Sequence, residues 1–510
     1  MNTDIQNSFL GTVIKSIYIS RKHSLNKLLK AFTFCMITGL LLVMGSCNSD
    51  SDVTDVPEDE MEVEFEGTDA EKTAFQYSTH CGGCHGQNFA SFVEREWAYG
   101  NSSEAILNSI NTGYADNGMP AYGTTFDDEE IKDLADYILT EIEGKTKEML
   151  ESENPDLSGL IVSDDLSFRL ETMTDDIPGT PWGIVQLPNG EILVTEISGR
   201  LFLIRTDKEL VEISGVPDVV ASGQGGLLDV LIHPDFDTNS LVYLSYSRAN
   251  PDNTSQRTTA VARGTLSGTS LENVETIFTA LPYLNSGHHF GSRLLFDQEG
   301  YLYVSVGDRG QRDTYPQNLD NQLGKIHRIH DDGEIPTNNP FINEQGAMGS
   351  IFTYGTRNPQ GMSLHPVTGA VWEGEHGPQG GDEVNILEAG NNNGWPVISY
   401  GINYDGTTFT DITEMAGMEQ PVHHWTPSIA PCGMSFLSGG FYGAWENDLF
   451  VGSLKFEYLH RLKMSGNVVV GHEELVQGIG RVRDVHMGSD GYIYLAVQGS
   501  NSVVRLVPEQ

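Results

Sequence analysis

The stretch Pro181–Ile204, PWGIVQLPNGEILVTEISGRLFLI, decides the fold. Its two short apolar runs, separated by a tight turn at Pro188–Gly190 and followed by another turn, predict a β-hairpin. Similar units begin further along the chain at Gly226, Gly291, Gly361, Gly433 and Val482. Six strand hairpins without long helical patterns between them predict an all-β six-bladed β-propeller over residues 164–510. A β-sandwich is the alternative, but it would not need the same hairpin six times.

A second pattern, STHCGGCHGQ at 78–87, lies before the hairpins. Two cysteines two residues apart, followed at once by histidine, are typical of c-type haem attachment. Cys81 and Cys84 would form the thioether bonds and His85 would ligate the iron. A redox dithiol or half of a zinc site are the alternatives. Zinc requires four ligands, however, and this region has no second cysteine pair.

The sixth haem ligand is predicted to be Met119 in NGMPAYG, because glycine and proline fix a loop that can present a side chain to a flat cofactor. The following DDEEIKDLADYIL predicts a short amphipathic helix. Together these features resemble a small, all-α class I cytochrome c over residues 69–145, with residues 146–163 as a linker to the propeller.

The N-terminal residues predict that the protein is exported from the cytoplasm. Basic residues precede AFTFCMITGLLLVMGSC, an apolar run short for a membrane span that ends at Cys47 among small residues. This resembles a bacterial lipoprotein signal peptide at 1–46, with Cys47 lipidated and 47–68 forming an acidic tether. An uncleaved membrane anchor is the alternative. Both place the protein outside the cytoplasm, in the periplasm or at the cell surface, anchored to a bacterial membrane.

The charge balance narrows the possible partners. The 510 residues include 71 acidic and 29 basic side chains, for a net charge of −42, which argues against nucleic acid or anionic lipid. Basic residues that cluster against this trend are therefore informative. Propeller loops gather at one end of the central channel, so the cations Arg357, Lys455, Arg481 and Arg483 can converge on an anionic ligand. For any one of them, a surface salt bridge is the alternative.

Residues 164–508 resemble the PQQ-dependent soluble aldose sugar dehydrogenases of the glucose/sorbosone dehydrogenase family. The resemblance rests on separated motifs in order: SGHHFGSRLLF, VGDRGQRD, YGTRNPQG, EHGPQGGDEVN, GSLKFEY and GRVRDV. It implies that His289 is the general base, that Asp308 orients it, and that Arg357 stabilises charge on the quinone. It further implies that PQQ is held by Arg357, Asn358, His376, Asp382, Ser428, Lys455, Arg481 and Arg483.

The same resemblance implies two Ca²⁺ positions. One lies under the quinone at the carbonyls of Gly377 and Pro378, and the other at Glu383 and the backbone of Asn393. Gln224 matches a sugar-contacting glutamine. The chain departs from the family at Trp425, which stands one residue early in HHWTPSIAPCG, and at His288, where relatives have an acidic residue.

These features predict a quinohaemoprotein with PQQ, Ca²⁺ and haem c as cofactors. It would oxidise an aldose at C1 to the lactone by hydride transfer to PQQ and pass the electrons singly to its own haem, and then to a respiratory acceptor. A calcium-dependent hydrolase, such as a lactonase, and a glycan-binding module are the alternatives, since fold does not determine function.

Overall fold

The computed structural model describes residues 68–81, 85, 89, 92–93, 97–114, 119, 121–123, 125–146 and 156–509. The predicted signal peptide, the lipidation site Cys47, the tether up to residue 67 and the haem cysteine Cys84 lie outside these residues. Within the described part of the chain, no helix has the length and hydropathy needed to cross a membrane.

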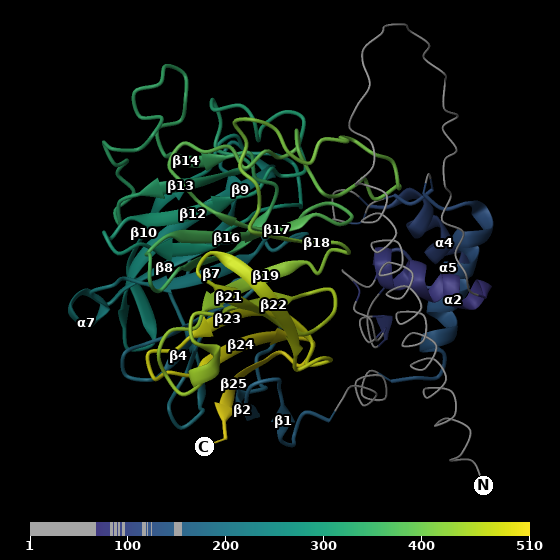
Figure 1. Cartoon of the computed structure of the whole chain (residues 1–510), viewed down its shortest axis with the longest axis horizontal. Coiled ribbons are helices and arrows are strands. Elements are labelled where there is room, and N and C mark those ends of the chain that lie inside the picture. Colours follow the sequence, from purple (N-terminus) through teal and green to yellow (C-terminus); the bar gives the residue numbers. More distant parts are fainter. Residues whose placement is uncertain are drawn as a thin grey trace, which may run out of the picture. The chain divides into compact units, whose positions relative to one another are not determined.

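The described residues from 161 onward form six antiparallel sheets (Figure 1). The first four are β3 (Pro181–Gln186), β4 (Ile192–Glu196), β5 (Arg200–Ile204) and β6 (Leu210–Ile213); β7 (Leu227–Ile232), β8 (Leu241–Asn250), β9 (Asn253–Ser267) and β10 (Ser270–Thr279); β11 (Leu294–Phe296), β12 (Leu302–Val306), β13 (Lys325–Ile329) and β14 (Ile351–Tyr354); and β15 (Pro359–Leu364), β16 (Val371–Glu375), β17 (Asp382–Ile386) and β18 (His423–Trp425).

The fifth sheet comprises β19 (Pro431–Phe436), β20 (Leu449–Ser453), β21 (Leu459–Ser465) and β22 (Val468–Leu475). The sixth has the order β1 (Ile161–Val162), β2 (Ser167–Thr174), β25 (Ser502–Pro508), β24 (Ile493–Gln498) and β23 (Arg481–Met487). Two short helices, α7 (Phe236–Asn239) and η4 (Gly443–Trp445), lie in the connections. Each predicted hairpin is the inner part of one sheet.

The innermost strands of the sheets form a closed ring. Contacts run from β3 to β7, β11, β15, β19 and β23 in turn, and from β23 back to β3. Strand β3 is buried along its whole length, as expected for a strand that lines the centre of a propeller. The prediction of a six-bladed propeller is therefore confirmed.

The last blade joins the two ends of the propeller chain. Strand β2 pairs antiparallel with the C-terminal β25, in a register that sets Phe168 opposite Pro508 and Arg169 opposite Val507. Strand β2 leads directly into β3 of the first blade, so this pairing within the last blade joins the two ends of the propeller chain by backbone hydrogen bonds.

Apolar clusters fill the spaces between neighbouring blades. One joins Leu193 and Leu203 of the first blade to Val230 and Leu244 of the second. At the centre, the buried Arg293 guanidinium binds Asp229 (Nη1 to Oδ1, 2.8 Å) and Asp484 (Nη1 to Oδ1, 2.9 Å). These carboxylates lie on β7 and β23, so a buried ion network links the blades across the channel.

The N-terminal described region is helical: α2 (Asp69–Gln76), the π-helix η1 (Tyr77–Cys81), α4 (Ser103–Thr112) and α5 (Asp128–Ile142). Helix α5 begins at a capping box in which Asp127 and Glu130 bind each other's backbone N–H, and it buries Ile131, Leu134 and Ile138 on one face. This is the amphipathic helix that the sequence predicts.

Candidate active site

His289 and Asp308 form a close pair at one end of the propeller. Nδ1 of His289 lies 2.6 Å from Oδ1 of Asp308, and the two side chains are 14% and 1% exposed. His289 precedes the innermost strand β11 and Asp308 follows the adjacent β12. Because the two strands are antiparallel neighbours, the start of one and the end of the other lie together.

Electrostatics keep the His289 imidazole neutral. Burial lowers its pKa below the ordinary value of 6.5, and the charge of Arg357 lowers it further, while Asp308 opposes both effects. Burial raises the pKa of Asp308, but His289 and Arg357 more than offset this, so the pKa stays below its ordinary value. A carboxylate that accepts from Nδ1–H leaves Nε2 as a proton acceptor, which is the arrangement of a general base.

Asp308 is fixed by further donors. Its Oδ2 accepts from the indole Nε1–H of Trp395 (2.9 Å), and its Oδ1 also accepts from the backbone N–H of Gly310 (2.7 Å). Its own backbone N–H donates to the carbonyl of Arg357 (2.8 Å). With these partners the carboxylate has a single orientation, and so does the imidazole that it holds.

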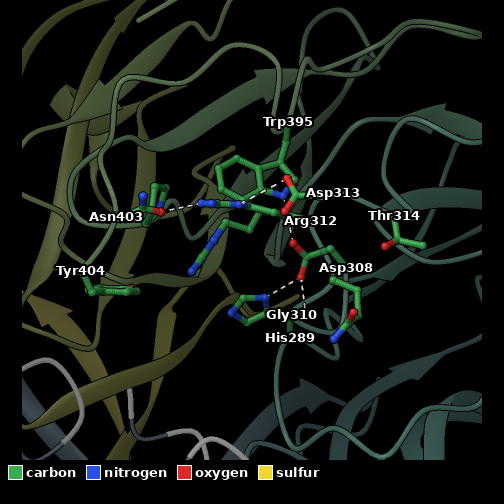
Figure 2. Close-up of a pocket in the computed structure, with 12 residues that line it drawn as sticks. His289, Asp308, Gly310, Arg312, Asp313, Thr314, Trp395, Asn403 and Tyr404 are labelled. Carbon is green, nitrogen blue, oxygen red and sulfur yellow. Dashed lines mark hydrogen bonds and ion pairs between the residues drawn. The ribbon is translucent and has the colours of Figure 1, made fainter. Parts of the chain in front are cut away.

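The pair faces a cavity of about 310 Å³, shown in Figure 2. Its wall also includes Arg357, Pro378 and Trp395. The five consecutive loop residues 310–314 and a second loop with Asn403 and Tyr404 complete it. The volume is at the lower end of the range for small-molecule pockets, which is roughly 300–1,000 Å³.

Arg357 and Asn358 enter the site from the start of β15. Their backbone N–H groups both donate to Oε2 of Glu375, and Arg357 Nη1 donates to the carbonyl of His376 (2.9 Å). Asn358 Oδ1 accepts from the N–H of Gly291 (3.0 Å), while its buried Nδ2 has no partner among the described residues. The amide therefore keeps a donor for a ligand.

His376, Asp382 and Ser428 form an adjoining group. Oδ1 of Asp382 accepts from the N–H of Gly377 (2.8 Å), and Ser428 Oγ donates to the carbonyl of Pro378 (2.9 Å). Burial raises the pKa of Asp382 to about 6 and lowers that of His376 well below its ordinary value. The buried Nε2 of His376 also lacks a partner within the described part of the chain.

The remaining predicted cofactor-binding cations lie on the last two blades. Lys455 follows β20 and is 6% exposed, and burial lowers its pKa while Asp382 raises it. Arg481 and Arg483 begin β23, and their Nε atoms share Oε1 of Gln498 (3.3 and 2.8 Å). Neither Arg357 nor Arg483 forms an ion pair with a described carboxylate, so their charges are available to an anionic ligand.

Oxygen atoms lie at the predicted calcium positions. Glu383 lies directly opposite Glu375 in the β16–β17 register, and burial together with the charge of Glu375 raises its pKa. Nδ2 and Oδ1 of Asn393 are buried without a partner among the described residues. In the described part of the chain, no three His, Cys, Asp or Glu side chains form a metal-ligating group. Calcium therefore stays a prediction, which rests on the carbonyls of Gly377 and Pro378 for one ion and on Glu383 and the backbone of Asn393 for the other.

Several residues around the dyad have no signal in the sequence motifs. Trp395 is the aromatic side chain that contacts Asp308, whereas Trp425 packs in a core cluster with Trp372 and donates its indole N–H to His460. Gln224, predicted to contact sugar, accepts from the backbone N–H of His289 through Oε1 (2.8 Å). It thus supports the loop of the candidate base.

Three of the four predicted haem residues meet in the helical region. Cys81 and Met119 belong to one apolar cluster, and the His85 ring stacks on Phe92 of the same cluster at 4.7 Å between centroids. Met119 is held by backbone hydrogen bonds to Tyr114 (2.8 and 3.2 Å). Haem attachment at these residues stays a prediction.

Comparison with known proteins matches two family models to this chain. The model described as Glucose / Sorbosone dehydrogenase matches residues 179–505, and the model described as Cytochrome C oxidase, cbb3-type, subunit III matches residues 68–138. Aldose sugar dehydrogenase YliI of Escherichia coli (strain K12) is 41% identical over 360 residues, which cover 69% of this chain and 96% of that protein.

Two further likenesses support the same assignment. Quinoprotein glucose dehydrogenase B of Acinetobacter calcoaceticus is 28% identical over 394 residues, covering 61% of this chain and 80% of that protein. The crystal structure of the soluble aldose sugar dehydrogenase from E. coli, in its apo-form, is 40% identical. It superposes with a TM-score of 0.63 and covers 67% of this chain and 100% of that chain.

Proposed function

The chain belongs to the glucose/sorbosone dehydrogenase family and carries an N-terminal cytochrome c domain, and from this premise we propose that it is a PQQ-dependent aldose dehydrogenase with its own haem. The substrate is an aldose that is oxidised at C1 to the lactone. The electrons go to the haem and then to a respiratory acceptor. The observation that supports this most directly is the His289–Asp308 pair in a cavity that also contains Arg357.

The residues present fit a tricarboxylate quinone. Asn358 Nδ2 and His376 Nε2 are buried polar atoms without partners in the described structure, and both belong to the predicted PQQ set. Arg357 and Arg483 act electrostatically on His376, and Lys455 and Arg481 complete the predicted set of cations. A relative of this chain is named a quinoprotein. When bound, PQQ would supply the two-electron acceptor, and the haem would supply the one-electron acceptor.

The protein residues have distinct tasks in this proposal. His289 Nε2 accepts the proton of the anomeric hydroxyl, which contributes roughly 10²- to 10⁴-fold to the rate. Asp308 keeps the proton on Nδ1 and stabilises the imidazolium that forms. Arg357, anchored to the carbonyl of His376, places a guanidinium where negative charge develops. The carbonyls of Gly377 and Pro378 would hold Ca²⁺, and Glu383 with Asn393 would hold a second ion.

Attachment and location complete the proposal. Haem c would be bound by Cys81 and Cys84 and ligated by His85 and Met119, and Cys47 would carry lipid that anchors the protein to a bacterial membrane outside the cytoplasm.

The haem itself serves as the detector in the test. The full chain is matured with haem c, loaded with PQQ and Ca²⁺, oxidised, and mixed with D-glucose, D-galactose or maltose while the visible spectrum is recorded. We expect haem reduction that requires PQQ and is slowed roughly 10²- to 10⁴-fold in H289N. If an artificial dye is reduced but the haem is not, the internal electron path is wrong.

The alternatives predict different outcomes. A lactonase would hydrolyse a lactone without PQQ and without any change in the haem spectrum. A glycan-binding module would bind sugar with no turnover of either kind. Either result would overturn the dehydrogenase proposal.

A further inference from the structure

The loop that carries His289 has an unusual backbone. His289 has φ of +48° and Ser292 has φ of +78°, in the left-handed region that non-glycine residues seldom adopt. A Cβ on Gly307 would lie 2.1 Å from the carbonyl oxygen of His289, so the loop packs directly on the end of β12. Such a conformation persists only where the surrounding structure holds it.

Arg309 is a buried residue that contacts this loop. It is 0% exposed, and its Nη1 and Nη2 donate to the carbonyls of His288 and Ser286, respectively. Its guanidinium carbon lies 3.4 Å from the centroid of the Phe290 ring. A guanidinium reaches both carbonyls from the two ends of a rigid planar fork while its face lies on the aromatic ring, a fixed geometry that the single ammonium group of a lysine lacks.

The contact is reciprocal. The Ser286 hydroxyl donates to the carbonyl of Arg309 (2.8 Å), and the N–H of His288 donates to the same hydroxyl (3.2 Å). Arg309 also follows Asp308 directly in the chain. Consecutive residues therefore hold His289 in two ways: Asp308 binds its ring, and Arg309 binds the backbone that precedes it.

We propose that Arg309 is a positioning residue for the dehydrogenase reaction, which holds the loop at residues 286–290 so that the His289 imidazole stays on Asp308 with Nε2 toward the cavity. This inference rests on the proposed function. Arg309 needs no contact with the sugar or with PQQ for this role, because it acts through the backbone of the loop.

Its charge has a second consequence that can be measured. The charged and titratable groups that act on His289 are Asp308, Arg309, Arg357, His288 and His376. Asp308 raises the pKa of His289, whereas burial, Arg357 and Arg309 lower it. Removing the Arg309 charge therefore raises the pKa of His289, and the acidic limb of the pH profile must move to higher pH.

The test compares R309K, which keeps the charge but loses the fork, with R309M, which loses both. The full-length, haem-containing protein is loaded with PQQ and Ca²⁺, and kcat, KM and the pH profile are measured with D-glucose. We expect both variants to lose about tenfold or more in plateau kcat with a smaller change in KM. Only R309M should shift the acidic limb, and the shift should be to higher pH.

R461K is the matched control, because Arg461 is equally buried but binds Asp165, Asp448 and Glu473, away from the His289 loop. It should keep the wild-type pH limb. Wild-type plateau kcat in R309K, or a loss in R309M with an unmoved limb, would overturn the proposal. If R309M does not fold, the plateau kcat of R309K decides.

A readout independent of turnover separates this inference from the proposed function. Diethyl pyrocarbonate reacts with neutral imidazole, so its rate of reaction at His289, followed by peptide mass mapping of the cofactor-free protein, reports the pKa of that residue. An upward shift in R309M but not in R309K supports the role of Arg309 even if no aldose is oxidised. An unchanged profile in R309M contradicts it.

Discussion

His289 differs from an ordinary turn histidine in three respects: its left-handed backbone, its contact with a buried carboxylate, and its place on the wall of a cavity. Most single histidines in a core are structural, so no one of these features identifies a base. Together they define a neutral imidazole with one nitrogen fixed and the other directed to a ligand space.

The first prediction at this scale concerns the charge of Asp308. Because this carboxylate raises the pKa of His289, D308N should move the acidic limb of kcat/KM to lower pH, the reverse of R309M. The neutral base is the active form, so activity is present above the pKa and lost below it. The variant should also lose roughly 10²-fold in kcat, because the tautomer is no longer held. A pH profile between 4 and 8 measures both effects, and an upward shift would contradict the assignment.

The second concerns Trp395, whose indole N–H donates to Asp308. W395F removes this donor and should lower kcat by about tenfold, since one buried carboxylate oxygen loses its partner. W372F is the control of equal size, because Trp372 is fully buried in a blade and its indole N–H has no described partner. Steady-state kinetics and melting curves of both variants separate loss of catalysis from loss of packing. Equal losses of kcat in both would remove Trp395 from the site.

Sequence motifs identify the dyad but not the rest of the cavity wall. His289 and Asp308 lie in recognisable motifs beside adjacent strands, so their meeting follows from the topology. Arg312, Asn403 and Tyr404 lie in long irregular loops, where no periodicity indicates which side chains turn inward. The hydrogen bond that Gln224 accepts from the backbone N–H of His289 likewise could not be predicted from a sequence pattern.

At the scale of elements, the inner strands of each blade were predictable and the outer strands were not. Strand β3 is buried throughout, and its apolar run is plain in the sequence. The outer strand β22 alternates between exposed and half-buried residues, and β18 has only three residues. The position of such strands depends mainly on backbone pairing with a neighbouring strand. Their own residues therefore show a weaker apolar pattern. The partnership of β2 with β25 joins distant ends of the chain and has no local signal.

The prediction for the elements concerns the pairing of β2 with β25. R169P should remove a backbone donor and disturb the β2–β25 ladder, because Arg169 lies opposite Val507. We expect a loss of a few kcal/mol in the free energy of unfolding, seen as a lower Tm in a thermal melt. R169A, which keeps the backbone and loses only the exposed ion pair with Glu509, should cost about 1 kcal/mol or less. Equal effects would mean that closure does not depend on this ladder.

For the whole molecule, the charge distribution separates two kinds of basic residue. In a chain of net charge −42, most cations are expected to pair with the many carboxylates, as Arg461 does with three of them. Arg357 and Arg483 form no such pair among the described residues, and both act electrostatically on His376. Cations kept apart from an excess of acids are consistent with a site that receives an anion.

A haem in the same chain as the dehydrogenase domain would make electron transfer between them intramolecular. The predicted linker joins the haem domain and the propeller in one chain, and such a covalent connection gives a local haem concentration on the order of millimolar. Haem reduction after a pulse of aldose should therefore be first order, with a rate constant independent of protein concentration. Stopped-flow traces over a hundredfold range of dilution measure this.

A mixture of two variants tests the same prediction by forcing electron transfer to occur between molecules. H289N retains the haem but should not oxidise sugar, and C81A/C84A should oxidise sugar but lack the haem. In a mixture, electrons must pass between molecules, so haem reduction should become second order and slow in proportion to dilution. High salt should alter this intermolecular rate, since two strongly acidic proteins repel each other, and should leave the wild-type rate nearly unchanged. A wild-type rate that falls with dilution, as the mixture does, would show that the attached haem is not the first acceptor.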